Sequence, residues 1–316
     1  MEENQTMIKK DVIIIGAGPA GMTAALYASR ASLDTLMIER GVPGGELMNT
    51  ADVENYPGFG KIPGPELAMK FFESASAFKA ETVYGAVDKV EIKDGNKLVY
   101  LADKIYQAPV LIIATGATHR KLGVSGEEEL AGRGVSYCAV CDGFFFKDKD
   151  VMVIGGGDSA VEEGTYLTQF ANSVTVVHRR DALRAQKILQ ERAFANPKMK
   201  FIWDSVVDEI QGQDQVESIK LRNVKTDEAS TLAFDGVFVY VGLVPNSELF
   251  TDLGITDEQG WIITDDQMQT AQDGIYAIGD VRAKNLRQVA TAVGDGSIAG
   301  QKAYDYIQTL AYQEEL

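Results

Sequence analysis

The two cysteines are the residues of this chain best suited to chemistry, because they are its only thiols and stand three positions apart. The sequence has 316 residues, and Cys138 and Cys141 lie in the stretch VSYCAVCDGFF (135–145), with Asp142 directly after them. A C-x-x-C pair is compatible with half of a metal site, with a structural disulfide, or with a disulfide that opens and closes during a reaction. The spacing alone leaves these three alternatives open.

The size and composition of the chain weigh against the first two alternatives. With 316 residues, of which 45% are hydrophobic, the chain can form about two domains and bury a core without disulfides. A disulfide across two intervening residues would also restrict the unfolded chain very little. A zinc site would need two more ligands, and the histidines His119 and His178 lie far apart in the sequence. We therefore expect no metal.

The net charge of −16 argues against nucleic acids and anionic membranes as partners, since both require a basic surface. The amino terminus MEENQTMIKK has mixed charge, unlike a secretory signal. Residues 12–29 are uncharged, but their glycines and proline favour a strand, a turn and a helix over a membrane span. We expect a cytoplasmic protein, and in that compartment a C-x-x-C pair is more often redox-active or metal-bound than structural.

A strand, turn and helix pattern occurs twice. The segments DVIIIGAGPAGMTAALYASR (11–30) and DVMVIGGGDSAVEEGTYLTQ (150–169) share an acidic residue, an apolar run, a glycine-rich turn and helical spacing. One such turn can be an ordinary packed βα turn, whereas two in the same context predict two dinucleotide sites, with each pyrophosphate at a helix N-terminus. The turns are G-x-G-x-x-G at Gly16, Gly18 and Gly21, and G-x-G-x-x-A at Gly155, Gly157 and Ala160.

The end of the following strand distinguishes the two sites. DTLMIER (34–40) places Glu39, and SVTVVHRR (173–180) places His178, at the same offset from their turns. A carboxylate there accepts hydrogen bonds from a free ribose 2′-hydroxyl, whereas a basic residue favours a 2′-phosphate. The first site should therefore take FAD or NAD, and the second NADP(H).

A cluster of basic residues supports NADP(H) at the second site. In this acidic chain, residues 178–192 contain five basic side chains against the two acids Asp181 and Glu191. Such a cluster can simply be the solvated face of a helix, but downstream of a dinucleotide turn it indicates a clamp for a 2′-phosphate, whose oxygens match the guanidinium fork. The basic residues are Arg179, Arg180, Arg184, Lys187 and Arg192.

Two segments near the carboxyl end complete the pattern. DGIYAIGDV (273–281) predicts a short buried strand that ends at Gly279 and Asp280, and RQVATAVGDGSIAGQKAYDYI (287–307) has helical apolar spacing. By itself the Gly-Asp pair is equally consistent with a simple turn.

Taken in order, these segments closely resemble the low-molecular-weight thioredoxin reductases of bacteria, which are FAD- and NADPH-dependent pyridine nucleotide-disulfide oxidoreductases. The resemblance covers nearly the whole chain. It is carried by GAGPAG, GGELMNTADVENYPGF (44–59), ATG (114–116), CAVCDG (138–143), GGGDSAVEE (155–163), HRRDALRAQ (178–186) and IGDV (278–281).

The resemblance implies an α/β fold with two Rossmann-like, doubly wound dinucleotide-binding domains, the NADPH domain being inserted into the FAD domain. The FAD-binding domain would comprise residues 1–117 and 246–316. The NADPH-binding domain, which carries the C-x-x-C pair, would comprise residues 118–245. A homodimer is expected from the resemblance alone.

The resemblance also implies the residues of both sites. Glu46 stands where the family often has glutamine, and a carboxylate cannot donate a hydrogen bond to the flavin ring, which leaves this contact open. For FAD the residues are Gly16, Gly18, Pro19, Ala20, Gly21, Glu39, Arg40, Gly45, Glu46, Leu47, Asn55, Val87, Thr115, Gly116, Gly279, Asp280, Arg287, Gln288 and Val289. For NADPH they are Gly155, Gly157, Asp158, Ser159, Glu162, His178, Arg179, Arg180, Arg184 and Gly242.

The expected reaction passes electrons from NADPH through FAD and the Cys138–Cys141 disulfide to the disulfide of a small protein, thioredoxin. Asp142 is the candidate acid for the departing thiolate, and a helix N-cap is its alternative role. Because the disulfide and the nicotinamide must both reach one flavin, we expect the inserted domain to rotate between two states.

Other functions remain as alternatives. The reductase that serves a peroxidase carries an additional amino-terminal thioredoxin-like region, which we do not expect here. A ferredoxin reductase of this fold would lack the cysteines, and an oxygen-dependent thiol oxidase would not need an NADP clamp. From a different class, the chain could be a flavin-bound redox sensor without turnover.

Overall fold

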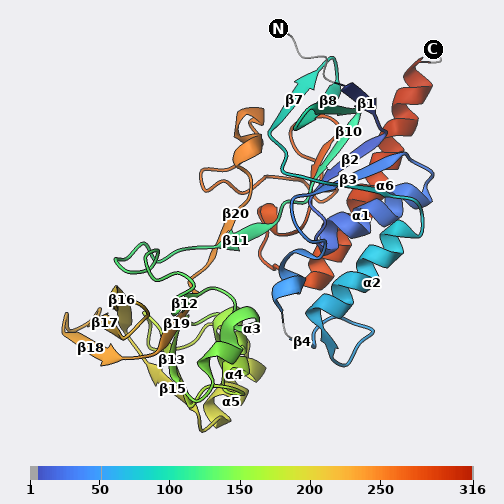
Figure 1. The fold of residues 1–316 in the computed structure, drawn as a ribbon. Coiled ribbons are helices and arrows are strands. Elements are labelled where there is room, and N and C mark those ends of the chain that lie inside the picture. The colour runs from blue at the N-terminus through green and yellow to red at the C-terminus, as the bar shows by residue number, and fades with distance from the viewer. Residues whose placement is uncertain (1–5, 51, 315–316) are drawn as a thin grey trace. The chain divides into compact units, whose positions relative to one another are not determined.

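The computed structural model describes residues 6–50 and 52–314. The chain divides into two compact units, each of which is described separately (Figure 1). Unit 1 contains Met1–Thr118 and Val244–Leu316, and unit 2 contains His119–Leu243.

The centre of unit 1 is a five-stranded parallel sheet with the order β21-β10-β2-β3-β6. Strand β21 joins the sheet from the far end of the chain by pairing with β10. The strands are continuous apolar runs, as expected for a sheet that is covered on both faces. Their bounds are β2 (Val12–Ile15), β3 (Thr35–Glu39), β6 (Glu81–Tyr84), β10 (Val110–Ile113) and β21 (Ile275–Ala277).

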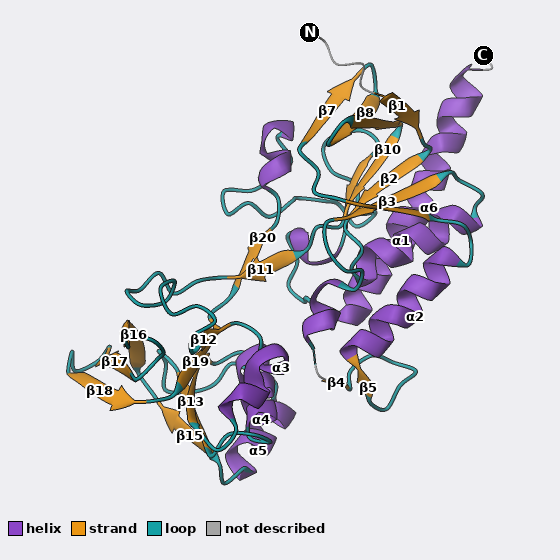
Figure 2. Cartoon of the chain, viewed as in Figure 1, coloured by secondary structure: helices purple, strands orange, loops and turns teal. Residues whose placement is uncertain are grey.

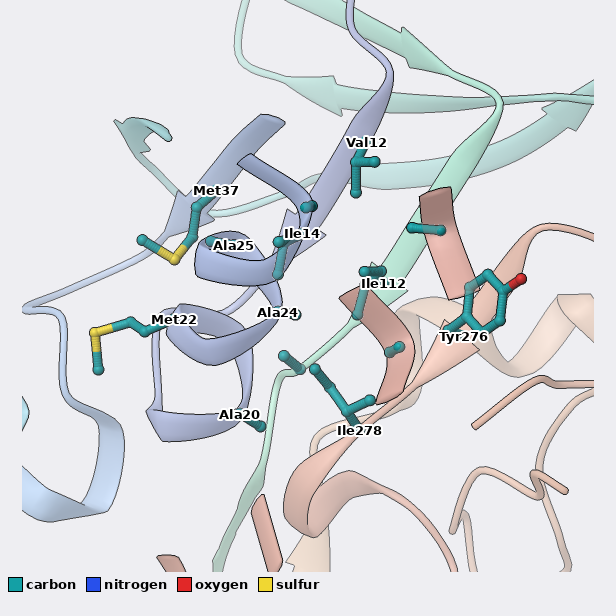
Figure 3. Close-up of a cluster of buried hydrophobic side chains, with 14 of the residues drawn as sticks. Val12, Ile14, Ala20, Met22, Ala24, Ala25, Met37, Ile112, Tyr276 and Ile278 are labelled. Carbon is teal, nitrogen blue, oxygen red and sulfur yellow. The ribbon is translucent and has the colours of Figure 1, made fainter. Parts of the chain in front are cut away.

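One face of this sheet packs against helices. Helices α1 (Pro19–Arg30), α2 (Gly64–Ser76) and α6 (Val289–Glu314) lie side by side there (Figure 2). Because side chains alternate along a strand, Val12 and Ile14 of β2 enter the core under the helices, together with Ala24 and Ala25 of α1 (Figure 3).

The opposite face of the sheet is covered by a second, smaller sheet. Ile13 and Ile15 of β2 point to this side and pack in a separate core cluster. The order of the second sheet is β1-β9-β8-β7, and its strands are β1 (Thr6–Lys9), β9 (Lys104–Ala108), β8 (Asn96–Leu101) and β7 (Lys89–Lys93). The short elements of unit 1 are η1 (Gly45–Asn49), β4 (Asp52–Val53), β5 (Ile62–Pro63), η3 (Glu248–Leu253) and η4 (Gly279–Val281).

Unit 2 repeats this plan. Its parallel sheet has the order β12-β19-β13-β14-β15, with one core cluster on the side of its helices and another on the side of an antiparallel sheet. The parallel strands are β12 (Val135–Ser136), β13 (Asp150–Gly155), β14 (Ser173–Val177), β15 (Met199–Ile202) and β19 (Gly236–Tyr240). The helices are α3 (Ala139–Asp142), η2 (Gly143–Phe146), α4 (Asp158–Leu167) and α5 (Lys187–Ala195). The antiparallel strands are β16 (Ser205–Gln211), β17 (Ser218–Asn223) and β18 (Ala229–Ala233).

The two predicted repeats occupy equivalent places in their sheets. Strand β2 lies between β3 and β10, and β13 lies between β14 and β19. In each case the first strand of the repeat is central, and its glycine-rich turn leaves the carboxyl end where the strand order reverses, which is where such folds bind dinucleotides. The predicted α/β fold with two Rossmann-like sheets is confirmed.

Two short strands carry the chain across the boundary between the units. Strands β11 (Ala117–His119) and β20 (Leu243–Pro245) form a two-stranded sheet with each other. Within residues 6–50 and 52–314, no helix is both long enough and apolar enough to cross a membrane.

Candidate active site

The turn between β2 and α1 shows the close backbone contacts of a dinucleotide turn. Gly16 has a φ of +107°, and a Cβ there would lie 2.3 Å from the carbonyl oxygen of Ala114. A Cβ on Gly21 would lie 1.9 Å from the oxygen of Gly16, so α1 packs directly on the turn. A Cβ on Gly18 would meet no atom within 4 Å. Open space is thus left beside the helix N-terminus, which fits a pyrophosphate.

The carboxylate of Glu39 is fixed beside this turn. The backbone N–H of Ala17 donates to its Oε2 and that of Gly41 to its Oε1, both at 2.8 Å. Each carboxylate oxygen can accept a further hydrogen bond. A fixed carboxylate at this position fits a ribose with a free 2′-hydroxyl and repels a 2′-phosphate.

The segment that begins at Gly44 folds back onto the same turn. The N–H of Gly44 donates to the oxygen of Ala17 at 2.7 Å, and a Cβ on Gly45 would lie 3.3 Å from the Cα of Gly18. Leu47 is buried in the next turn of chain. Further along, Nδ2 of Asn55 donates to Oε1 of Gln288 at 2.8 Å, so two predicted flavin residues from opposite ends of the sequence are in contact.

Asp280 has the buried, unsatisfied oxygen expected of a ligand-binding group. Its Oδ1 has no hydrogen-bond partner among the described residues. Burial raises the pKa of Asp280, the cations Lys284 and Arg287 lower it, and the carboxylates of Asp295 and Glu46 raise it further. Because an unsatisfied buried polar group is costly, this oxygen fits a ligand hydroxyl such as those of the FAD ribityl chain.

The remaining predicted flavin residues surround these elements. Oγ1 of Thr115 donates to the backbone oxygen of Asn246 at 2.6 Å, and the N–H of Asn246 donates to the oxygen of Gly116 at 3.0 Å. Both residues are therefore tied to the segment where the chain re-enters unit 1. Arg287 lies over the ring of Trp261 at 3.7 Å and donates to the backbone oxygens of Asp280 and Arg282.

Five more flavin residues are placed by the ends of secondary-structure elements or by the core. Pro19 and Ala20 begin α1, and Val289 begins α6. Arg40 is exposed after β3, and Val87 packs against the core on the side of the smaller sheet. The role of Arg40 and Val87 in binding stays a prediction.

The second turn, between β13 and α4, repeats the geometry of the first. A Cβ on Gly155 would lie 2.4 Å from the oxygen of Tyr240 and 2.8 Å from the Cβ of Ala160. A Cβ on Gly157 or Gly242 would meet nothing within 4 Å. Ser159 and Glu162, the other predicted NADPH residues here, are exposed at the start of α4.

A loop between β14 and α5 is docked on this second turn. The N–H groups of Arg184 and Ala185 donate to the oxygen of Gly156 at 2.6 and 3.1 Å. The carboxylate of Asp158, the first residue of α4, accepts from the backbone N–H and from Nε2 of Gln186, both at 2.8 Å. Asp158 therefore positions the basic loop beside the turn.

Three guanidinium groups of this loop carry no counter-charge. Arg179, Arg180 and Arg184 are exposed, and within the described part of the chain none of them forms an ion pair. The neighbouring acid Asp181 pairs instead with Lys225, at 3.2 Å. Because α5 begins only at Lys187, these arginines are not the solvated face of a helix. They fit a site for a phosphate.

His178 is a packing residue rather than a source of charge. It is buried, and a Cβ on Gly156 would lie 2.5 Å from its Nδ1. Burial lowers the pKa of His178, and the nearby charges of Arg184, Arg180 and Arg179 lower it further. Its imidazole is therefore neutral at pH 7, so the positive charge at this ribose position comes from the arginines. Its buried Nε2 has no partner among the described residues.

The redox turn follows β12 in unit 2. Cys138 is disulfide-bonded, which does not suit a thiolate ligand of zinc. Its N–H donates to Oγ of Ser136 at 3.0 Å, and the N–H of Ala139 donates to the hydroxyl of Tyr240 at 2.9 Å. The side chain of Cys141 lies outside the described residues, so its pairing with Cys138 stays a prediction.

Asp142 ends α3 and precedes η2. Its carboxylate is partly buried and forms no capping hydrogen bond, although the residue occupies the N-cap position of η2. The structure therefore does not support the helix-cap alternative, since among the described residues no N–H of η2 donates to the Asp142 side chain. The role of Asp142 as a proton donor stays a prediction.

Two phenylalanines beside the redox turn were missed by the sequence reading. Phe144 is 67% exposed and Phe145 71% exposed, whereas Phe146 is buried against Phe238. Adjacent exposed aromatic rings are unusual on a surface with no partner. The signal is in the sequence: of three successive phenylalanines in one short helical turn, only one can enter the core.

The division into units separates the two predicted sites. Every residue predicted to bind FAD lies in unit 1, and every residue predicted to bind NADPH lies in unit 2 with the redox turn. Each unit therefore holds one dinucleotide turn and the groups that surround it.

Comparison with known proteins gives consistent matches over most of the chain. The family model described as pyridine nucleotide-disulphide oxidoreductase matches residues 10–296. A thioredoxin reductase of Listeria innocua is 61% identical over 303 residues, covering 95% of this chain and 94% of the relative. A thioredoxin reductase of Bacillus subtilis is 58% identical over 303 residues, covering 95% of both chains.

The fold also matches solved structures. A crystal structure of Lactococcus lactis thioredoxin reductase, described as its FR conformation, superposes with a TM-score of 0.94 at 55% identity. The match covers 95% of this chain and 99% of the solved one.

Proposed function

The chain belongs to the pyridine nucleotide-disulphide oxidoreductase family, and from this premise we propose that it is an NADPH-dependent thioredoxin-disulfide reductase that uses FAD. The observation that carries the proposal is the disulfide-bonded Cys138 in the same unit as a dinucleotide turn and three arginines that form no ion pair within the described residues. A redox-active thiol pair beside a site for a phosphorylated nicotinamide coenzyme serves the reduction of a further disulfide. The curated relatives named above carry the same activity in their names.

The residues that would hold each cofactor follow from the two units. When bound, FAD and NADPH supply the two-electron chemistry that amino-acid side chains lack. In unit 1, the first turn, Glu39 and Asp280 fit FAD. In unit 2, the second turn and Arg179, Arg180 and Arg184 fit NADPH. We accordingly propose residues 1–117 and 246–316 as the FAD-binding domain and residues 118–245 as the NADPH-binding domain.

The chemistry of the chain itself is disulfide exchange. Two electrons and two protons open the disulfide of Cys138 to two thiols, and Cys141 is the proposed second sulfur. One thiolate attacks a sulfur of the thioredoxin disulfide, forming a mixed disulfide while the other thioredoxin sulfur leaves and takes a proton. The remaining thiolate then displaces thioredoxin as its dithiol and restores the original disulfide. Asp142 would supply the proton to the departing sulfur.

The disulfide and the nicotinamide must each reach the same flavin. The redox turn and the NADPH residues, however, belong to the same unit. We therefore propose that unit 2 rotates on the connecting strands β11 and β20, which would limit the rate of turnover. We further propose that the protein acts in the cytoplasm as a homodimer. Sedimentation of the purified protein would check that it is a dimer.

A coupled assay tests this function. The protein is loaded with FAD and given NADPH, and NADPH oxidation is followed with and without oxidised thioredoxin. We expect consumption that depends on thioredoxin. Consumption that depends only on oxygen would indicate a thiol oxidase instead. Bleaching of the flavin without onward transfer to any protein disulfide would indicate a redox sensor.

Replacement of Asp142 should slow the exchange step. In Asp142→Asn we expect kcat for thioredoxin reduction to fall about 100-fold, within the usual range for a lost general acid. The KM for NADPH should not change, because the nucleotide residues are untouched. Steady-state rates across pH should show that the loss shrinks as the pH rises above the pKa of the leaving thiol, because the thiolate then departs without taking a proton. An unchanged kcat would remove Asp142 from the mechanism.

The exposed aromatic pair should contribute to the binding of thioredoxin. In the double variant Phe144→Ala/Phe145→Ala we expect the KM for thioredoxin to rise about tenfold, since loss of two exposed anchors weakens an interface by about 1.4 kcal/mol or more. Phe78→Ala, which removes a half-exposed phenylalanine of unit 1, is the matched control. If both variants keep the same KM for thioredoxin, the pair is not a docking surface.

A further inference from the structure

Asp295 is a buried carboxylate on α6, and its side-chain partners among the described residues all lie in one short segment. It is 7% exposed. The N–H of Gly279 donates to its Oδ2 at 3.0 Å, Nζ of Lys284 donates to the same oxygen at 2.8 Å, and a guanidinium nitrogen of Arg282 donates to Oδ1 at 3.1 Å. Buried charges require such partners. The segment 279–284 is therefore tied to α6 by one side chain.

The residue between these contacts is the predicted flavin ligand Asp280. The peptide N–H that Asp295 accepts belongs to Gly279, whose φ of +71° turns the chain sharply just before Asp280. The orientation of that peptide decides where the side chain of Asp280 leaves the backbone. Since Oδ1 of Asp280 is buried without a partner among the described residues, the protein itself does little to hold this oxygen in place.

Helix α6 is also fixed against the start of α1. A Cβ on Gly296, the residue after Asp295, would lie 2.4 Å from the oxygen of Ala20, and a Cβ on Gly279 would lie 3.0 Å from the Cβ of Ala20. Ala20 belongs to the first dinucleotide turn. Asp295 thus connects the segment that carries Asp280 to the turn that faces the pyrophosphate, and these are two separate parts of the FAD site.

We propose that Asp295 is a positioning residue for FAD: by binding Gly279, Arg282 and Lys284 it fixes the Asp280 carboxylate relative to the Gly16–Gly21 turn. The inference rests on the proposed use of FAD by unit 1. Asp295 does not itself touch the cofactor; it acts through Asp280. Its removal should therefore weaken FAD binding without affecting the nucleotide site of unit 2.

The experiment measures FAD affinity directly. The full-length protein is stripped of flavin and titrated with FAD, and the quenching of flavin fluorescence gives the Kd for wild type, Asp295→Asn and the control Asp305→Asn. Asp305 lies on the same helix and accepts from Lys302 at 3.1 Å, in an exposed ion pair. We expect the Kd of Asp295→Asn to rise about tenfold or more, with an altered visible circular dichroism of the bound flavin. The control should match wild type.

Two further measurements separate positioning from a general loss of stability. The urea midpoint of the apoprotein should fall in Asp295→Asn, because two buried cations lose their carboxylate partner, but the Kd for NADPH should stay at the control value. A Kd for FAD within about twofold of wild type overturns the inference, as does a loss of FAD affinity that is matched by an equal loss of NADPH affinity.

A second variant keeps the test valid if Asp295→Asn does not fold. The double variant Asp295→Asn/Lys284→Met removes one charge of each sign, so the net charge of the cluster stays as in wild type, and it should still raise the Kd for FAD. A folded double variant with wild-type affinity overturns the inference. A wild-type apoprotein that takes up no FAD would instead refute the proposed function, so the two failures are distinguishable.

Discussion

The variants Cys138→Ser and Cys141→Ser should each lose thioredoxin-dependent NADPH oxidation by about 10³-fold or more, since the covalent route is removed and not merely weakened. A serine hydroxyl cannot form the disulfide that accepts the electrons, and its alkoxide is not populated near neutral pH. The coupled assay with thioredoxin measures the loss. It is the largest effect expected from any single substitution in this chain.

The same variants contain their own control. The residues that fit FAD lie in unit 1, and those that fit NADPH lie at the second turn and its basic loop, so neither site includes a cysteine. We therefore expect NADPH to bleach the flavin of both variants in stopped-flow absorbance, even though thioredoxin is not reduced. Thioredoxin reduction above about a tenth of the wild-type rate in either variant would contradict the disulfide mechanism.

Local signals in the sequence were sufficient for much of the fold and for the two nucleotide turns. The apolar run before Gly16 and the one before Gly155 became β2 and β13, each central in a parallel sheet. The segment 273–281 became β21 and the turn η4, and the helical spacing from residue 287 became α6. These predictions succeeded because glycine turns and buried strands are determined by a few neighbouring residues.

Features that depend on distant contacts could not be predicted. Lys97 is 1% exposed and donates to the backbone oxygens of Gly95 and Pro109, and burial lowers its pKa to about 8. Nothing in KLVYL marks it as a buried cation, because its second acceptor, Pro109, comes from another part of the chain. Asp295 is similar, since its partners lie in another segment and its sequence context reads only as helix.

The role of His178 shows the same limit inside a predicted site. Its offset from Gly155 correctly located the end of β14, and its residue type indicated a positive group there. The structure buries the imidazole against Gly156, so desolvation keeps it neutral. The positive charge lies instead on the exposed arginines that begin one residue later, at Arg179. An exposed guanidinium keeps its hydration, whereas a buried imidazolium would lose it.

The second large effect is expected when Arg179 and Arg180 are replaced together. In the double variant Arg179→Gln/Arg180→Gln we expect the KM for NADPH to rise about 100-fold, because each charge-assisted hydrogen bond to a phosphate contributes about 1.5 kcal/mol or more and each 1.4 kcal/mol corresponds to a factor of ten. The KM for NADH should not change, since NADH lacks the 2′-phosphate that these side chains would bind. Steady-state kinetics with both coenzymes measures the two constants.

The contrast between the coenzymes separates recognition from a general electrostatic effect. The control Arg222→Gln removes a partly exposed arginine of the same unit, one that is already paired with Asp208 at 3.2 Å and Asp227 at 3.4 Å. It lowers the positive charge of unit 2 without touching the basic loop, so both KM values should remain at wild type. If the double variant Arg179→Gln/Arg180→Gln instead raises the KM of NADPH and of NADH equally, the loop does not recognise the 2′-phosphate. Added salt should weaken NADPH binding in wild type more than in the double variant, because screening acts mainly on exposed charges such as these.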